Sequence, residues 1–170
     1  MIVIVMGVTG SGKSTVGSRL ARELGWEFLD GDSLHPAANV EKMHRGISLT
    51  DADRLPWLRA VRTAIEERMA QGKSLVVACS ALKQSYRDEL KLSPEVSFVY
   101  LKGGFELIAE RLRARHGHFA TAAILEGQFR DLQEPEDAIA EDIGKPPLQI
   151  VEDIKRQLPA LGRQKHERRN

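Results

Sequence analysis

The sequence predicts an α/β fold, in which a five-stranded parallel sheet carries helices on both faces and so forms a three-layer sandwich. Two observations indicate this class. Short, continuous runs of apolar and often β-branched residues, such as 2–6 and 75–79, are typical of strands that are buried on both faces. Segments with apolar residues at helical spacing alternate with these runs, and that alternation favours a parallel sheet.

The first half of the chain shows the alternation from its start. Ile2–Met6 is the first apolar run, and Val16, Leu20 and Leu24 then recur at helical spacing until Gly25, a residue type that commonly ends helices. A short apolar run follows, and after it comes a segment with polar ends. We therefore expect a strand at 2–6, a helix at 14–24, a strand at 27–29 and a helix at 33–47.

The second half continues the same pattern. Thr50, with Asp53 three residues later, resembles a capping box at a helix start, and Gly72 ends that helix. Residues 117–119 separate two later helices, and the last apolar run is weaker and typical of an edge strand. We expect helices at 50–71, 83–91, 105–115, 121–132 and 147–158, and strands at 75–79, 97–101 and 138–143.

Length and composition favour one globular domain. A chain of 170 residues with a net charge of +1 can bury a sizeable core and has no charge excess that would attract nucleic acid. The apolar run at 2–6 is too short for a membrane span, and the single Cys79 fits a reducing compartment. We expect a cytoplasmic protein without a nucleic-acid or membrane partner, with one domain at 1–160 and a solvated basic tail at 161–170.

Residues 7–14 match the Walker A pattern Gly-x-x-x-x-Gly-Lys-Ser in full, between a predicted strand and a predicted helix. Glycines let the backbone wrap around phosphate oxygens, and successive N–H groups and the helix N-terminus attract the anion. Lys13 places a charge between the β- and γ-phosphates, and the Ser14 hydroxyl is suited to Mg²⁺. The pattern predicts a nucleoside triphosphate site made of Gly7, Val8, Thr9, Gly10, Ser11, Gly12, Lys13, Ser14 and Thr15.

Two carboxylates follow the second predicted strand. Asp30 and Asp32 are spaced by one residue, so on an extended segment they point the same way, beside the phosphate loop. We expect Asp30 to join Ser14 in holding Mg²⁺ and Asp32 to accept a hydroxyl proton. No Asp ends the third strand and no Asn-Lys-x-Asp occurs, which disfavours a motor-type ATPase and a GTPase. The pattern favours a kinase over a nucleotide-binding switch.

A pair of arginines suggests how water is excluded from the triphosphate site. Arg111 and Arg115 are four residues apart, so they share a helix face just before the predicted break. We expect a lid at about 115–132 that closes over the triphosphate and excludes water, as a small-molecule kinase requires. An exposed basic helix face is the alternative.

The segment at about 33–58 is expected to cover the acceptor. It contains His35, Arg45 and Arg54, and also Lys42, which we interpret as a surface residue. Arginine matches a carboxylate or phosphate through two parallel hydrogen bonds. The segment therefore predicts an anionic acceptor.

A series of short motifs, spread from residue 2 to about 155, resembles the gluconate kinases of the phosphate-loop type. Leu-Asp-Gly-Asp, His-Pro and Cys-Ser-Ala-Leu-Lys, in this order and spacing, are the specific ones. In this sequence the motifs stand at 7–14, 29–32, 34–36, 39–43, 51–54, 56–58, 79–83, 86–88, 100–103 and 117–119.

The resemblance implies a fold similar to that of shikimate and adenylate kinases, with ATP and Mg²⁺ as cofactors. It implies transfer of the γ-phosphate of ATP to the 6-hydroxyl of D-gluconate by a homodimer. Lys13, Asp32 and Arg115 would be catalytic, Arg111 would pack over adenine, and Lys145 and Pro146 would flank it. The expected gluconate-binding residues are Asp30, Asp32, His35, Ser80, Lys83, Gln128 and Glu134, with either Arg45 or Arg54 on the carboxylate. Another kinase of the same fold is the main alternative.

Overall fold

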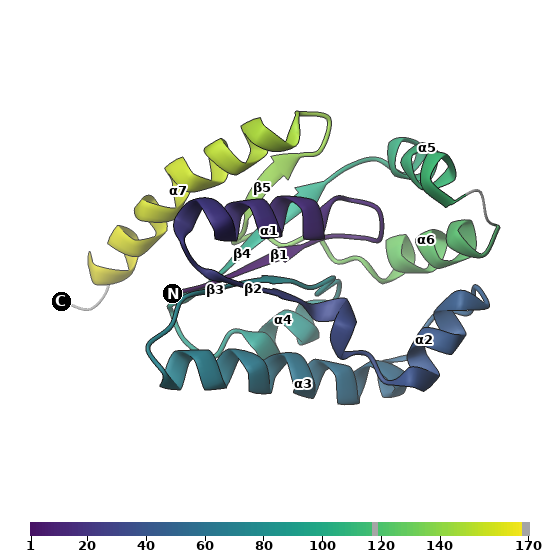
Figure 1. Ribbon diagram of the computed structural model, residues 1–170, viewed down its shortest axis with the longest axis horizontal. Helices are drawn as coiled ribbons and strands as arrows, with labels where there is room; N and C mark the ends of the chain where they lie inside the picture. Colours follow the sequence, from purple (N-terminus) through teal and green to yellow (C-terminus); the bar gives the residue numbers. More distant parts are fainter. Residues whose placement is uncertain (117–118, 168–170) are drawn as a thin grey trace.

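The computed structural model describes residues 1–116 and 119–167, and the predicted helix break at 117–118 and the last tail residues lie outside these ranges. Strands and helices alternate along the chain (Figure 1). The strands are β1 (Ile2–Met6), β2 (Glu27–Asp30), β3 (Leu75–Ala78), β4 (Val96–Lys102) and β5 (Ile139–Asp142). The helices are α1 (Lys13–Leu24), the 3₁₀ helix η1 (Gly31–Leu34), α2 (Ala37–His44), α3 (Asp51–Ala70), α4 (Gln84–Leu90), α5 (Phe105–His116), α6 (Phe119–Asp131) and α7 (Pro147–Glu167).

The five strands form one parallel sheet in the order β2-β3-β1-β4-β5, which confirms the predicted fold class. Strand β1 lies in the centre, between β3 and β4. Strand β5 pairs only with β4 among the described strands and so forms an edge, as its weaker apolar pattern predicted. In sheets of this type, ligands bind at the carboxyl ends of the strands, where the order reverses. The loop that follows β1 stands at such a point.

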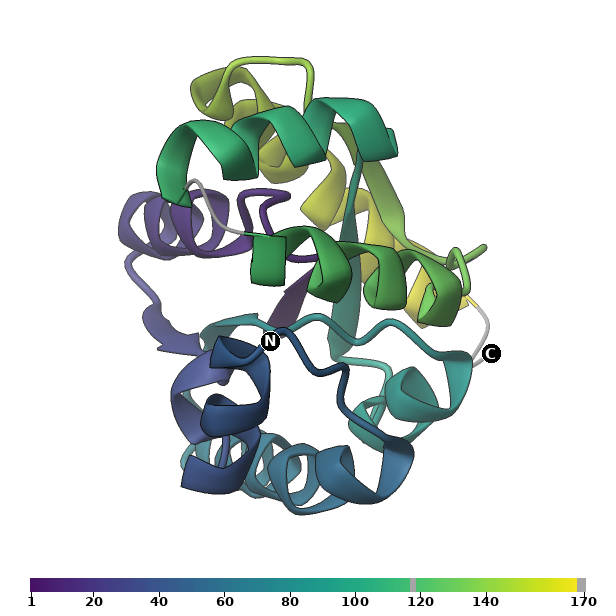
Figure 2. The ribbon, with the colours of Figure 1, turned by 90° about the vertical axis from the view of Figure 1, so that its right-hand side faces the viewer.

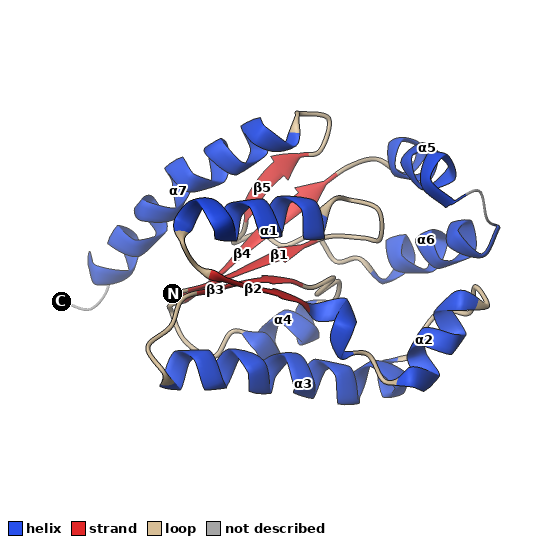
Figure 3. Cartoon of the chain, in the orientation of Figure 1, coloured by secondary structure: helices blue, strands red, loops and turns tan. Residues whose placement is uncertain are grey.

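Helices cover both faces of the sheet, and each face has its own apolar core (Figure 3). Alternate residues of a strand point to opposite faces. Val3 and Val5 accordingly pack into the core beneath α1, α5 and α7, whereas Ile2, Ile4 and Met6 pack into the core beneath α3 and α4. All five side chains are fully buried, so the phosphate loop begins on a rigid strand.

The predicted helix at 33–47 is two shorter elements. The chain forms η1, passes through His35 and Pro36 in extended conformation, and only then begins α2. Proline disfavours a helical conformation in the residue before it and fits the first positions of a new helix. Pro36 therefore separates the two elements. Helix α7 also runs farther than predicted, to Glu167.

Helices α2, α5 and α6 gather near the carboxyl ends of the strands, as the view turned by 90° shows (Figure 2). They approach the sheet's loops closely. A Cβ at Gly10 of the phosphate loop would lie 2.8 Å from the Leu112 side chain of α5, and one at Gly127 of α6 would lie 2.3 Å from Ser48 Oγ. Among the described helices, none combines the length and apolar composition needed to cross a membrane.

Candidate active site

The phosphate loop joins β1 to α1. Gly7, Gly10 and Gly12 have φ values of 152°, 77° and 96°, which a residue with a side chain rarely adopts. Lys13 is buried, and its Nζ donates to the Val8 carbonyl at 2.9 Å. The Ser11 hydroxyl is buried without a hydrogen-bond partner among the described residues. A buried ammonium and a buried, unpaired hydroxyl in one loop are suited to an anionic ligand.

Charge inside the loop is arranged around Lys13. Burial lowers the pKa of the Lys13 ammonium from its usual value, and the Asp32 and Asp30 carboxylates oppose that shift. Because burial disfavours a charge that has no close counter-ion, a bound polyphosphate would stabilise the charged form. The loop is therefore complementary to an anion that the protein itself does not supply.

Ser14 and Asp30 meet at the mouth of the loop. Ser14 Oγ, on the first turn of α1, donates to Asp30 Oδ2 at 2.8 Å. The other oxygen, Asp30 Oδ1, accepts from the Asp32 amide at 3.0 Å, which fixes the turn after β2. Asp32 itself is exposed beside the loop. The structure thus brings together the three residues that the sequence predicted for the metal and the acceptor hydroxyl.

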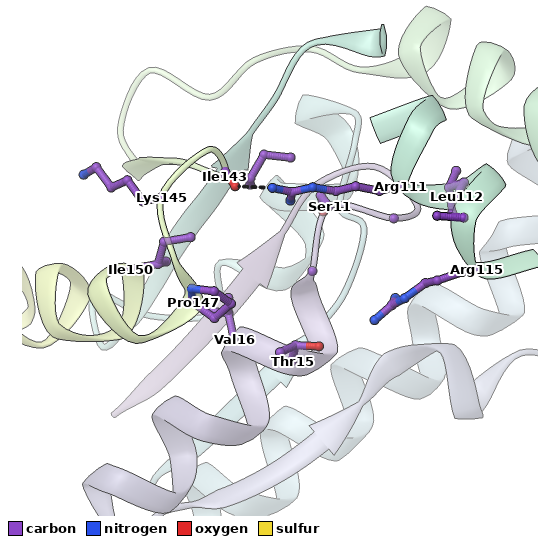
Figure 4. A pocket seen from close by; sticks show the side chains of 13 residues that line it. Ser11, Thr15, Val16, Arg111, Leu112, Arg115, Ile143, Lys145, Pro147 and Ile150 are labelled. Atoms are coloured by element: carbon purple, nitrogen blue, oxygen red, sulfur yellow. Dashed lines mark hydrogen bonds between the residues drawn. The ribbon is translucent and has the colours of Figure 1, made fainter. Parts of the chain in front are cut away.

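A cavity of about 310 Å³ opens on one side of the phosphate loop. Figure 4 shows Arg111 and Arg115 extending from α5 on one side, with Lys145, Pro147 and Ile150 on another. The Arg111 guanidinium is held against the wall by a 2.7 Å hydrogen bond from Nη2 to the Ile143 carbonyl. Arg115, which was predicted to be catalytic, thus lines one pocket with six of the predicted ATP-binding residues: Gly10, Ser11, Gly12, Thr15, Arg111 and Lys145.

Lys145 forms ion pairs with carboxylates in the wall of the cavity. Its Nζ lies 3.2 Å from the buried Glu141 carboxylate and 3.0 Å from the Asp153 carboxylate. These ion pairs hold the loop between β5 and α7 in place. Pro147, rather than the predicted Pro146, lines the cavity at this point.

Replacing Arg111 with alanine is expected to raise the KM for ATP by roughly fivefold to thirtyfold, the effect of losing 1–2 kcal/mol of stacking and positioning. The KM for the acceptor should stay within about twofold, because Arg111 faces the nucleotide cavity. Arg113→Ala on the same helix is the matched control, since Arg113 is exposed and does not line the cavity. Steady-state kinetics with each substrate varied tests this, and equal KM values for the two variants would contradict it.

The other side of the phosphate loop carries a network around Arg54. This residue lies in the first turn of α3 and is 7 % exposed. Its Nη1 donates to Tyr86 Oη at 3.1 Å and to Asp131 Oδ2 at 2.8 Å. Asp51 accepts hydrogen bonds from Tyr86 and, at 2.8 Å, from Lys83. The network joins α3, α4 and α6 around one guanidinium group.

His35 forms a second polar group on this side. Its ring stacks on Trp57, with the centroids 4.6 Å apart and the planes 10° from parallel. Trp57 is held in turn by a 2.8 Å hydrogen bond from Nε1 to the Gly31 carbonyl. Burial lowers the pKa of His35, Arg54 lowers it further, and the Asp32 carboxylate opposes both. Asp32 and Arg54 thus both act electrostatically on His35.

The remaining residues that were predicted to bind the acceptor lie in different parts of the structure. Ser80 lies beside the phosphate loop, where its carbonyl accepts from the Gly7 amide at 3.3 Å. Gln128 of α6 accepts from the Thr9 amide of the loop at 2.6 Å. Glu134 instead accepts from Tyr100 Oη at 3.0 Å and pairs with Lys102. Arg45, at the end of α2, is exposed.

Several contributing residues received no role from the sequence. Trp57 and Tyr86 lie inside motifs that carry the resemblance. The motifs indicated that these two residues contribute to the site, but not which contacts they make. Asp131 gave no local signal, because its partner Arg54 lies 77 residues earlier in the chain. Asn39 likewise stands in a motif, and only the fold shows its contact with His35.

A phosphate loop with a nucleotide-sized cavity on one side and carboxylate, imidazole and guanidinium groups on the other defines a phosphotransferase of the P-loop kinase class. The family model described as "AAA domain" matches residues 2–135. The thermoresistant gluconokinase of Escherichia coli (strain K12) is 48% identical over 150 residues, which cover 85% of this chain and 86% of that protein. The chain belongs to this P-loop family and to the gluconokinases.

Solved structures agree with that assignment. The crystal structure of a gluconokinase from Sinorhizobium meliloti 1021 matches with a TM-score of 0.86 and 41% identity, covering 99% of this chain and 97% of that one. Shikimate kinase from Aquifex aeolicus matches with a TM-score of 0.57 and 21% identity, covering 94% and 97% of the two chains. The latter likeness shows a shared fold.

Proposed function

We propose that this protein transfers the γ-phosphate of ATP to the 6-hydroxyl of D-gluconate, giving 6-phospho-D-gluconate and ADP. The observation that carries this proposal is the turn after β2, which joins two groups of polar residues. On one side Asp30 accepts from Ser14 of the phosphate loop at 2.8 Å, and on the other the Asp32 carbonyl accepts from the His35 amide at 3.3 Å. The Escherichia coli relative and the Sinorhizobium meliloti structure, both named as gluconokinases, supply the acceptor.

The chain's own groups fit ATP and Mg²⁺. The buried Lys13 and the unpaired Ser11 hydroxyl are suited to phosphate oxygens, and the cavity beside Arg111 is suited to the base and sugar. Ser14 Oγ and Asp30 Oδ2 are hard oxygen donors 2.8 Å apart, the kind that Mg²⁺ takes together with phosphate oxygens and water. Mg²⁺ held there would neutralise negative charge on the β- and γ-phosphates.

The transfer step follows from these positions. The gluconate 6-oxygen forms a bond to the γ-phosphorus, the bond from that phosphorus to the β,γ-bridging oxygen breaks, and the hydroxyl proton passes to the Asp32 carboxylate. Lys13 and Arg115 stabilise the charge that spreads over the transferred group and the leaving ADP. Asp32 both positions the hydroxyl and accepts its proton.

Arg54 is the better candidate for the gluconate carboxylate. Tyr86 and Asp131 both bind its Nη1, and within the described part of the chain no hydrogen bond engages its Nε or Nη2. A guanidinium that is held at one nitrogen keeps donors for a carboxylate and is already oriented. Arg45 is exposed at a helix end and lacks such support.

Replacing Arg54 with lysine is expected to raise the KM for gluconate roughly tenfold or more, because a lysine cannot make the paired hydrogen bonds to a carboxylate. Arg45→Lys, the matched variant, should change it by about twofold or less. Thermal unfolding of Asp131→Asn, which weakens the network but keeps Arg54, shows how much the network contributes to stability. A larger KM effect in Arg45→Lys than in Arg54→Lys would move the carboxylate site to Arg45.

A panel of acceptors tests the proposed function. ADP formation from ATP should be strongly stimulated by D-gluconate and not by shikimate or nucleoside monophosphates. A preference for one of the others would make the protein another kinase of this fold, and release of ADP without any acceptor effect would favour a nucleotide-binding switch. The homodimer and the cytoplasmic location stay predictions.

A further inference from the structure

The protein holds the imidazole of His35 through two contacts and also fixes its backbone. One face of the ring stacks on Trp57 and Nδ1 lies 3.3 Å from Asn39 Nδ2, while the backbone amide donates to the Asp32 carbonyl at 3.3 Å. Among the described residues, no hydrogen bond engages Nε2. The residue is partly exposed, so Nε2 remains accessible for a ligand.

The Asn39 amide determines which ring nitrogen carries the proton. Asn39 Nδ2 donates to the Asp53 carbonyl at 2.8 Å, and since a carbonyl can only accept, this end of the side chain must be the NH₂ group. An NH₂ group has a second hydrogen, and the neighbour in reach of it is His35 Nδ1. A ring nitrogen that accepts has no proton, so the proton of the neutral ring is on Nε2.

Asn39 is itself rigidly placed. It is 4 % exposed, and its backbone amide donates to the Pro36 carbonyl at 2.9 Å in the first turn of α2. The Asp53 carbonyl that it binds belongs to the first turn of α3. The side chains of Thr50 and Asp53 cap that turn reciprocally. A buried amide between two helix starts cannot easily rotate to present its oxygen to His35.

We propose that Asn39 is a positioning residue for phosphoryl transfer: it fixes His35 as the tautomer with the proton on Nε2, which then donates a hydrogen bond to a hydroxyl of the polyol acceptor. The inference rests on the proposed function for its substrate. The chemistry is complementary, because Asp30 and Asp32 as carboxylates only accept hydrogen bonds, whereas a hydroxyl needs a donor for its lone pairs while it gives its proton away. Without Asn39 the donor and acceptor nitrogens of the ring could exchange.

The tautomer can be read directly in the protein without substrates. Two-dimensional ¹H–¹⁵N spectra of the ¹⁵N-labelled chain distinguish a protonated from an unprotonated ring nitrogen, and comparison with His35→Gln identifies the His35 signals. We expect a neutral ring at neutral pH with the proton on Nε2. A proton on Nδ1, or an even mixture of the two tautomers, would overturn the proposal whatever the enzyme phosphorylates.

A double-mutant cycle tests the consequence for the substrate. Asn39→Ala removes the donor to Nδ1, so the neutral ring can take the tautomer with its proton on Nδ1, and the KM for gluconate should rise by up to about fivefold, as expected for one lost hydrogen bond. The KM for ATP should change by about twofold or less. In the His35→Gln background, where no tautomer exists, the same change at position 39 should have little further effect.

The cycle separates the possible failures. An equal loss from Asn39→Ala in both backgrounds would mean that Asn39 acts only on the structure, and the proposal would fail. If Asn39→Ala does not fold, Asn39→Leu, which removes the donor but keeps most of the buried volume, takes its place in the cycle. Failure of the proposed function would show separately, as an absence of gluconate-dependent ADP formation in the unmodified protein.

Discussion

Replacing Lys13 with methionine is expected to lower kcat by on the order of a thousandfold or more. The Lys13 ammonium is the charge closest to the point where the β- and γ-phosphates would lie, and it is buried, so its field on the transferred group is little screened by water. Methionine keeps most of the aliphatic length and removes the charge. Steady-state kinetics with saturating ATP and gluconate measures the effect.

The same variant should fold at least as well as the unmodified protein. Burial lowers the pKa of Lys13, which means that the folded chain holds this charge at a cost in stability. We therefore expect an unchanged or raised Tm. Lys73→Met is the matched control, since Lys73 is exposed and pairs only with Glu27 among the described residues. Near-normal turnover in Lys13→Met would contradict the role of the phosphate loop.

Replacing Asp32 with asparagine is expected to lower kcat by about a hundredfold to ten-thousandfold, the range found for a positioned proton acceptor. Asparagine is nearly the same size but cannot take the hydroxyl proton. The KM for ATP should stay within about twofold, because among the described residues no hydrogen bond joins the Asp32 side chain to the phosphate loop. A lower kcat with an unchanged KM for ATP distinguishes a residue that contacts the acceptor from one that binds the nucleotide.

Two further variants test whether the loss of kcat is specific to Asp32. Asp88→Asn is a surface control, since Asp88 is exposed on α4 and accepts a hydrogen bond only from Gln84 among the described residues. Asp30→Asn should instead raise the Mg²⁺ concentration needed for half-maximal rate, because Asp30 pairs with Ser14. Turnover of Asp32→Asn close to normal would exclude Asp32 as the residue that handles the acceptor hydroxyl.

The fold could be predicted because its signals are local. A strand buried on both faces is a continuous apolar run, and a helix repeats its apolar residues within one turn or two, so each element is visible in a short window of sequence. The capping box at Thr50 was found in this way and is confirmed. The division of the predicted helix at 33–47 was missed, because a proline near the start of a helical segment is also compatible with the first turn of one continuous helix.

The phosphate half of the site could also be predicted, since residues 7–14 form one continuous motif. The acceptor half could not be assembled from the sequence alone. Arg54 meets Asp131 from 77 positions away and Tyr86 from 32, and no periodicity connects residues so far apart. For the same reason, the contacts of Glu134 with Tyr100 and Lys102, which lie 34 and 32 residues earlier, could not be predicted, and its role toward the substrate stays a prediction.

Identifying the phosphorylated product tests the central claim most directly. ATP, Mg²⁺ and D-gluconate are incubated with the protein, and ³¹P and ¹³C spectra locate the new phosphate ester while ADP is measured in the same sample. We predict one 6-phospho-D-gluconate for each ADP, with almost no inorganic phosphate. Inorganic phosphate equal to the ADP formed, or a phosphate on another carbon of gluconate, would contradict the site as described.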